Sequence, residues 1–297
     1  MKIGYPCINT EITAKANNTF RLKSYTAEKF ISTVKHNLEG LLKILEYNVS
    51  KDLLFFRISS DIIPFASHEI LNVDWQTLFK NQLNIIGDFI KLNNMRISMH
   101  PGQFVIINSS NEKIVKNSEK ELIYHAQFLN SLNLDYTHKI QIHVGGAYGD
   151  KITSQNRFID NYKKLDDRIK NRLVIENDER LYSVQDCLKI SKSVNLPIIF
   201  DTLHHECNNN GETIKEGLNL AINTWTGLDG VAMVDYSSQA QNCKIGKHCQ
   251  TIDESHFRKF LEDVRDFNFD IMVEVKDKQV SALKVLKIIK EVKSTND

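Results

Sequence analysis

The sequence predicts an α/β fold, namely a single (β/α)8 TIM barrel domain that spans residues 1–297. Eight short apolar segments alternate with helical segments along the whole length of the chain. The apolar segments are continuous rather than alternating, which is expected for parallel strands buried on both faces. Metal-binding residue types follow most of these segments, and barrels of this kind place their active sites at the C-terminal ends of the strands.

The predicted strands are short runs rich in Ile, Val, Leu, Phe and Met. In chain order they are KIGYPC (2–7), LLFFRI (53–58), MRISM (95–99), KIQI (139–142), RLVI (172–175), PIIF (197–200), GVAMV (230–234) and DIMV (270–273). No linker, low-complexity stretch or repeat interrupts this series. A parallel sheet therefore accounts for the whole chain.

The predicted helices show apolar residues at helical spacing, as Phe30, Val34 and Leu38 do in the first of them. They cover residues 27–48, 75–93, 118–133, 154–170, 183–195, 213–225, 253–268 and 278–292. Ser183 and Asp253 are the predicted N-caps of their helices. One helix after each strand is the alternation that a closed barrel requires.

The composition is that of an ordinary globular protein, with 41% hydrophobic and 25% charged residues. A formal net charge of +1 excludes binding to DNA or membranes through an overall positive field, but a local basic groove remains open. We expect a cytoplasmic protein without a membrane segment, because no run of about 20 apolar residues is present. Five cysteines without a CxxC pair indicate reduced thiols.

Eight residues that can bind metal ions lie at or shortly after the ends of the predicted strands. They are His68, His100, His143, Glu176, Asp201, His204, Asp235 and Glu274. A single histidine after a strand is usually a loop residue, but eight such residues at one rim predict a metal site. Imidazole and carboxylate ligands suit Mn, Zn, Fe or Co, and Mg less well. Glu176 could bridge two ions, so we expect two or three divalent ions and no organic cofactor.

The segments around these residues resemble the UV damage endonucleases, a family of metal-dependent DNA-repair barrels. The similar segments are GYPCIN (4–9), FRISSDIIPFASH (56–68), MHPGQF (99–104), HVGGAYGDK (143–151), VIEND (174–178), FDTLHH (200–205), YSSQ (236–239) and MVEVKDK (272–278). The resemblance implies a hydrolase that nicks double-stranded DNA immediately 5′ to UV photoproducts, both cyclobutane pyrimidine dimers and 6-4 photoproducts. It further implies a monomer with bound Mn2+, associated with the nucleoid if the source is a prokaryote.

The resemblance also assigns ligands, with His68 near the site and Glu176 and Lys276 as catalytic residues. Three ions are implied. The first would be held by His100, His143 and Glu176, and the second by Glu176, Asp201, Asp235 and Glu274. The third would be held by His204 and His248. Gln103 and Phe104 stand where the family has a Gln–Tyr pair that probes the lesion, and Tyr5 and Asn9 match residues near the lesion. The chain departs from the family at Asp235, where a histidine is usual, and at Met233, where a lysine is usual.

Metal-assisted hydrolysis needs no side-chain nucleophile, and no Ser/His/Asp or Cys/His arrangement competes with it. Three other functions stay open at this point. A sugar isomerase or epimerase uses similar strand-end ligands on the same fold. An abasic-site endonuclease related to endonuclease IV shares the metal chemistry but acts on a different lesion, and a damage-binding protein without activity would bind irradiated DNA and leave it uncut.

Overall fold

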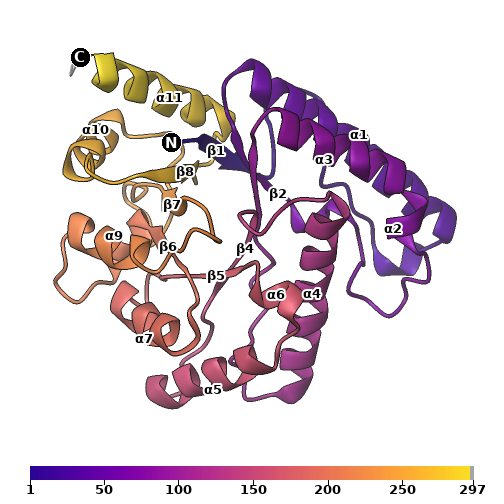
Figure 1. Cartoon of the computed structure of the whole chain (residues 1–297), viewed down its shortest axis with the longest axis horizontal. Coiled ribbons are helices and arrows are strands. Elements are labelled where there is room, and N and C mark those ends of the chain that lie inside the picture. Colours follow the sequence, from indigo (N-terminus) through magenta and orange to yellow (C-terminus); the bar gives the residue numbers. More distant parts are fainter. Residues whose placement is uncertain (295–297) are drawn as a thin grey trace.

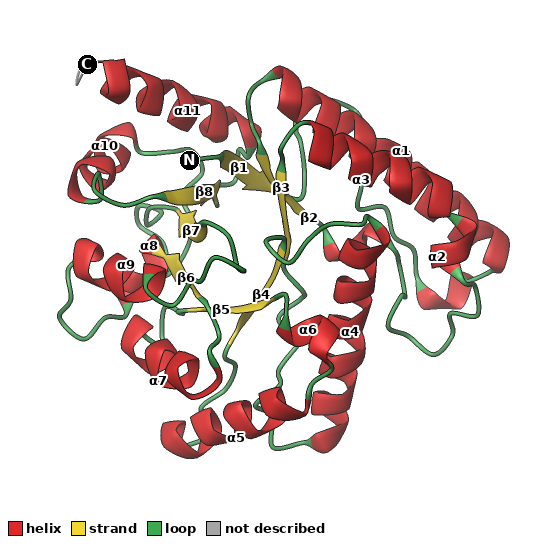
Figure 2. Cartoon of the chain, viewed as in Figure 1, coloured by secondary structure: helices red, strands yellow, loops and turns green. Residues whose placement is uncertain are grey.

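The computed structural model describes residues 1–294 and contains the predicted closed parallel barrel, in which each strand pairs with the next and the last with the first. Figure 2 shows the strands as a central ring surrounded by helices. The strands are β1 (Ile3–Pro6), β2 (Phe55–Ile58), β3 (Arg96–Met99), β4 (Lys139–His143), β5 (Leu173–Glu176), β6 (Ile198–Asp201), β7 (Ala232–Tyr236) and β8 (Phe269–Val273). The predicted fold class is confirmed.

The helices form the outer layer, and α11 brings the C-terminal end of the chain back beside β1 (Figure 1). The α-helices are α1 (Ala27–Ser50), α2 (Trp75–Leu78), α3 (Lys80–Leu92), α4 (Glu112–Ser131), α5 (Lys151–Lys164), α6 (Asp167–Lys170), α7 (Val184–Val194), α8 (Thr202–Cys207), α9 (Ile214–Ile222), α10 (Glu254–Asp263) and α11 (Gln279–Ser294). Short 3-10 turns lie at Leu22–Ser24 and Ser60–Ile62. Ser183 and Asp253 cap α7 and α10 as predicted.

Two predicted helices are each divided in the structure. Residues 75–93 form α2 and α3 because Phe79, which is buried, has non-helical dihedral angles between them. Residues 154–170 are broken at Leu165, whose backbone is extended, and Asp166 then caps α6 by accepting from the backbone N–H of Arg168. The apolar spacing continues across both breaks, so the spacing alone does not reveal them.

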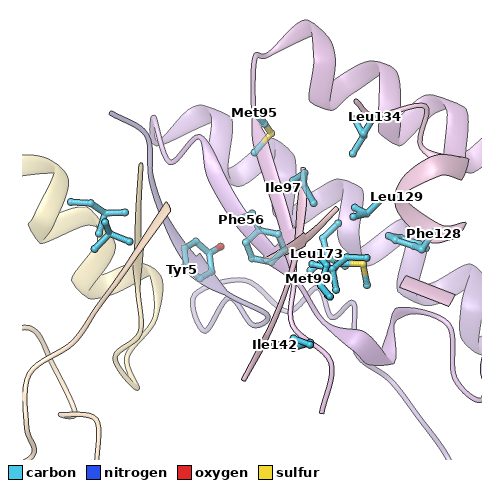
Figure 3. Packing of buried hydrophobic residues seen from close by; sticks show 14 of the residues in the cluster. Tyr5, Phe56, Met95, Ile97, Met99, Phe128, Leu129, Leu134, Ile142 and Leu173 are labelled. Carbon is cyan, nitrogen blue, oxygen red and sulfur yellow. The ribbon is translucent and has the colours of Figure 1, made fainter. Parts of the chain in front are cut away.

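The main apolar core lies between the outer face of the barrel and the helices. Figure 3 shows part of it, with Tyr5 of β1 beside Phe56 of β2, their ring centroids 5.3 Å apart. A smaller cluster fills the barrel interior with Phe55, Val174, Ile199, Met233 and Met272. Burial of these two sets of side chains is the main force that holds the ring of strands closed.

Side chains two residues apart on a strand point to the same face, and this alternation positions the polar residues. Phe55, Val174, Ile199, Met233 and Met272 form one interior layer. The residues two positions later form the next layer toward the C-terminal ends of the strands, and they are Arg57, Glu176, Asp201, Asp235 and Glu274. The apolar layer is therefore the floor of a polar, ionisable layer.

The opposite end of the barrel interior also carries charge. Arg96 donates to Asp270 at 2.9 Å, and Lys139 donates to Asp229 at 2.6 Å. These pairs close the N-terminal mouth of the barrel and lie on the far side of the apolar layer. Within the described part of the chain, no helix has both the length and the apolar character needed to cross a bilayer.

Candidate metal centre

The barrel gathers five of the predicted ligands in one place through strand register. His143 at the end of β4 is level with Glu176 of β5, and Asp201 of β6 is level with Asp235 of β7. Glu274 directly follows β8. Glu176, Asp201 and Asp235 are at most 2% exposed, and burial of carboxylates at that level is costly unless cations or hydrogen-bond donors face them.

The first group of candidate ligands consists of His100, His143 and Glu176. The Nε2 atoms of the two histidines lie 3.5 Å and 3.8 Å from Oε2 of Glu176. One ligand atom from each residue lies within 4.8 Å of the others. Two imidazoles and a carboxylate at this separation match the ligand set predicted for the first ion.

The second group consists of Glu176, Asp201 and His204, on the other side of the shared glutamate. The Nδ1 atom of His204 lies 3.0 Å from Oε1 of Glu176 and 3.6 Å from Oδ2 of Asp201. The two carboxylate oxygens of Glu176 thus face different groups, which is the arrangement that a bridging carboxylate requires.

Three histidines of the site direct one ring nitrogen to a backbone carbonyl. Nδ1 of His100 lies 2.9 Å from the carbonyl oxygen of Pro101, and Nδ1 of His204 lies 3.0 Å from that of Asn177. Nδ1 of His248 lies 2.5 Å from the carbonyl oxygen of Glu274. A carbonyl can only accept, so Nδ1 carries a proton in each ring, and in the neutral form of the ring Nε2 keeps the lone pair that a metal-binding histidine uses.

The resemblance paired His204 with His248 at a third ion. Their rings are perpendicular, with centroids 6.1 Å apart. Among the residues that the structure describes, His248 belongs to none of the candidate ligand groups, whereas His204 belongs to the second. His248 nevertheless lines the same hollow as His100, Glu176 and His204, so its assignment as a ligand stays a prediction.

The third group, Asp201, Asp235 and Glu274, already contains a cation. The guanidinium of Arg57 donates to both carboxylate oxygens of Asp235 at 2.9 Å and to Glu274. It also donates to Oε1 of Gln141 at 2.7 Å. The guanidinium of Arg57 therefore lies between Asp235 and Glu274, where an ion shared with Asp201 was predicted.

Arg57 and Gln141 are site residues that the sequence interpretation missed. Both lie inside runs that read as buried strands, FFRI and KIQI. An arginine in the middle of such a run is a usable signal, because a guanidinium in the barrel interior needs a carboxylate partner. The glutamine connects the groups, since its amide nitrogen donates to Glu176 and to Asp235 at 2.5 Å each.

The charges of the site shift the acidity of its members. Burial would raise the pKa of Glu176, but the imidazoles of His143, His100 and His204 hold it well below its usual value. Burial raises the pKa of Asp201 to about 7. Burial would lower the pKa of His204, yet Asp201 and Glu176 raise it to about 11.

The carboxylates beside Arg57 respond to burial and to its charge. Burial would raise the pKa of Glu274, but Arg57 lowers it to about 2. Burial raises the pKa of Asp235, with Arg57 opposing the rise.

Two polar atoms of the candidate ligands have no hydrogen-bond partner among the described residues. Oδ2 of Asp201 and Nδ1 of His143 are buried without a hydrogen-bond partner in the chain. A buried carboxylate oxygen in this state is costly, and a bound cation would relieve the cost. The first two groups therefore fit divalent ions, while Arg57 already meets the charge requirement of Asp235 and Glu274.

Three predicted site residues lie apart from these groups. Tyr5 is fully buried, its hydroxyl donates to Asn48 at 2.6 Å, and the amide of Asn9, itself only 4% exposed, donates to that hydroxyl at 2.8 Å. Both side chains are buried in the structure, and their predicted contacts with damaged DNA stay a prediction. His68 accepts from the backbone N–H of Ile70 at 3.0 Å and is in none of the candidate groups among residues 1–294.

The predicted probe residues lie at the mouth of the site. Phe104 is 66% exposed, and Gln103 lines two adjoining hollows that share His100 and His143. One hollow, of about 340 Å³, has apolar walls from Pro101, Val105, Ile106, Ile142 and Leu181. Lys276 is exposed, so its predicted catalytic role stays a prediction.

Comparisons with known proteins show the family to which the chain is similar. A family model described as UV-endonuclease UvdE matches residues 1–297. A UV DNA damage endonuclease of Clostridium perfringens is 46% identical over 297 residues, which cover 99% of this chain and 72% of the relative. A relative of the same description from Bacillus cereus strain Q1 is 34% identical over 89% of this chain and 84% of its own length.

The crystal structure of SacUVDE superposes with a TM-score of 0.95 and 46% identity, covering 99% of both chains. Endonuclease IV from Thermus thermophilus superposes with a TM-score of 0.58 at 13% identity, over 85% of this chain and 94% of that one, and this likeness concerns the fold alone. The full-length family match and the identity to curated relatives are decisive together, and the chain belongs to the UvdE family of UV endonucleases.

Proposed function

We propose that the chain is a metal-dependent endonuclease that nicks double-stranded DNA immediately 5′ to cyclobutane pyrimidine dimers and 6-4 photoproducts. The observation that carries the proposal is the pair of ligand groups on either side of Glu176, each within 4.8 Å, at the open end of the barrel. Divalent ions bound there, with Mn2+ the first candidate, would polarise the attacking water and neutralise charge on the phosphate. The relatives' descriptions supply the substrate class.

The chain's own residues hold this centre in a fixed geometry. Gln141 donates to Glu176 at 2.5 Å and restricts the rotation of the shared carboxylate. The bonds from His100 and His204 to backbone carbonyls fix the orientation of each ring and direct Nε2 away from the backbone. Such supporting bonds keep ligands in place before the metal binds, which raises affinity and limits reorganisation during the reaction.

Damage recognition is assigned to the loop after β3. The exposed ring of Phe104 is suited to stack on a base beside the lesion, and Gln103 lines the hollow that contains the candidate ligands. A pyrimidine dimer pairs and stacks poorly, so its extrusion costs less than that of normal bases. The apolar hollow beside His100 and His143 is the place we assign to the extruded lesion.

The remaining assignments follow from the same proposal. We place the activity in the cytoplasm on nucleoid DNA, with the whole barrel working as one domain and one monomer. The net charge of +1 gives no overall attraction to DNA, so contacts at the barrel mouth must supply the affinity. The lesion preference would then depend on Gln103 and Phe104 rather than on electrostatic affinity.

The test is an incision assay on a labelled duplex that carries one cyclobutane dimer, with the metal-free protein and added Mn2+. We expect a nick at the 5′ side of the dimer with a 3′-hydroxyl, no nick without metal, and none in the undamaged duplex. A duplex with one abasic site and a ketose substrate form separate arms. Incision of the abasic duplex alone would favour the abasic-site endonuclease, epimerisation of the sugar would favour the epimerase, and binding of irradiated DNA without any nick would indicate an inactive damage-binding protein.

A further inference from the structure

We propose that the guanidinium of Arg57 is a built-in cation that takes the position of a metal ion between Asp235 and Glu274, so that the centre holds two metal ions and not three. The inference rests on the proposed function, because it assumes that the other ligand groups bind metal. It concerns a residue on β2, a strand that, like β1, contributes no metal ligand to the candidate groups within residues 1–294.

The position of Arg57 follows from strand alternation. Phe55, two residues earlier, belongs to the apolar interior cluster, and Arg57 is in the layer above it. From β2 the side chain reaches Asp235 on β7 and Glu274 after β8, and it is only 3% exposed. The guanidinium is thus inside the barrel, at the level of the candidate ligands.

The hydrogen bonds leave no free oxygen on Asp235. Both of its oxygens accept from Nη2 of Arg57, and Oδ2 also accepts from Gln141 at 2.5 Å. Asp201 in the same group differs, because its Oδ2 atom has no partner in the described chain. In the third group, Arg57 thus satisfies both oxygens of Asp235 and donates to Oε1 of Glu274, whereas Asp201 remains available to an ion on the side of His204.

A guanidinium excludes a metal from this position by charge and by volume. It keeps its proton at any ordinary pH, and its planar group of donors fills the space between the two carboxylates. An ion within bonding distance of Asp235 would lie close to this fixed positive charge with little water between them. The repulsion would be strong because the site is buried.

The summed charge of the polar layer is consistent with two bound divalent ions. The layer contains the carboxylates of Glu176, Asp201, Asp235 and Glu274. These four negative charges, two divalent ions and Arg57 leave one net positive charge, which matches a single phosphodiester group. A third divalent ion would leave three positive charges in a buried cavity, which is costly to desolvate.

Metal stoichiometry tests the inference without measuring activity. The chelator-treated full-length protein is titrated with Mn2+ by calorimetry, and its metal content is measured by elemental analysis after dialysis against Mn2+. We expect two ions per chain for the native protein and for Arg57→Lys, which keeps the charge. We expect three for Arg57→Met, in which Asp201, Asp235 and Glu274 are free to act together.

Arg96→Met is the matched control, because it removes a buried arginine from the opposite end of the barrel, where Arg96 pairs with Asp270. It should lose stability and still bind two ions. Three ions in the native protein would overturn the inference, as would a folded Arg57→Met that binds two. If Arg57→Met does not fold, anomalous scattering from native crystals decides, because a manganese peak at bonding distance from Asp235 contradicts the inference. Absence of any bound metal would instead contradict the proposed function.

Discussion

The imidazole of His204 lies 3.0 Å from one carboxylate oxygen of Glu176, while His100 faces the other oxygen at 3.5 Å. Glu176 is therefore the residue common to two candidate metal groups. It ends β5, and its 2% exposure means that solvent contributes little to balancing its charge. Neighbouring side chains and bound ions must do so instead.

Replacement of Glu176 by Gln should reduce incision of damaged DNA by at least about a hundredfold, since it removes the charge shared by two ions. Metal content should fall in parallel, as measured by elemental analysis. Glu206→Gln is the matched control, because Glu206 has the same carboxylate but contacts His256 at 2.8 Å, outside the candidate groups. Unchanged metal content in Glu176→Gln would remove its bridging role.

Replacement of Phe104 by Ala should raise the Kd for a dimer-containing duplex by about tenfold, because stacking on a base contributes roughly 1–3 kcal/mol. Metal content should stay the same, which separates recognition from the metal centre. Leu92→Ala serves as control, since Leu92 is 86% exposed at the end of α3 that leads into the opposite mouth of the barrel. Equal affinities of Phe104→Ala and the parent for the damaged duplex would exclude the probe role.

Acid should destabilise the fold partly through His125, which is fully buried on α4 and donates from Nδ1 to the backbone carbonyl of Glu121. Burial lowers the pKa of His125 from 6.5 to about 4. The unfolded chain therefore takes up a proton near pH 6.5, before the folded protein does. Stability contributed by the neutral ring is present above that pH and is lost as the pH falls toward 4.

The expected loss attributable to His125 between pH 7 and pH 5 is about 2 kcal/mol in the free energy of unfolding. Urea titrations at both pH values measure it. His125→Gln should lose less stability on acidification, although His138, whose pKa burial also lowers to about 4, keeps part of the effect. His36→Gln, at an exposed position, should behave as the parent. An identical acid loss in His125→Gln would refute this assignment.

Gly87 in α3 should resist substitution in spite of helix propensity. A Cβ atom there would lie 1.9 Å from the carbonyl oxygen of Leu132, so α3 and the end of α4 must separate. We expect Gly87→Ala to lower stability by about 1–3 kcal/mol, which exceeds the gain of up to about 1 kcal/mol from alanine in a helix. Thermal unfolding checks this against Gly227→Ala, where the added atom meets nothing within 4 Å. A raised Tm in Gly87→Ala would contradict the packing argument.

The order of strands and helices was predictable because buried parallel strands and amphipathic helices have different apolar spacing. The exact ends of the helices were less predictable from the sequence. The breaks at Phe79 and Leu165 depend on local dihedral angles, and the start of α4 at Glu112 depends on the cap formed by Asn111, within a polar segment that shows no apolar spacing. Periodicity carries no information on such points.

The ligands of the candidate site were predictable where they lie at or just after the end of a predicted strand. His100, His143, Glu176 and Asp201 follow or end their strands, and the register brings them together. Arg57 was missed because a basic residue inside an apolar run does not show which partner it will meet across the barrel. The partner is known only once the strands close, when β2 faces β7 and Asp235 meets its countercharge.

The most direct test of the metal centre is anomalous scattering from crystals of the full-length protein soaked in Mn2+. Data recorded on both sides of the manganese absorption edge assign each peak to the metal. We predict a manganese peak within bonding distance of Glu176 beside His100 and His143, and a second peak on the side of Asp201 and His204. Fully soaked crystals with no manganese peak next to Glu176 would contradict it.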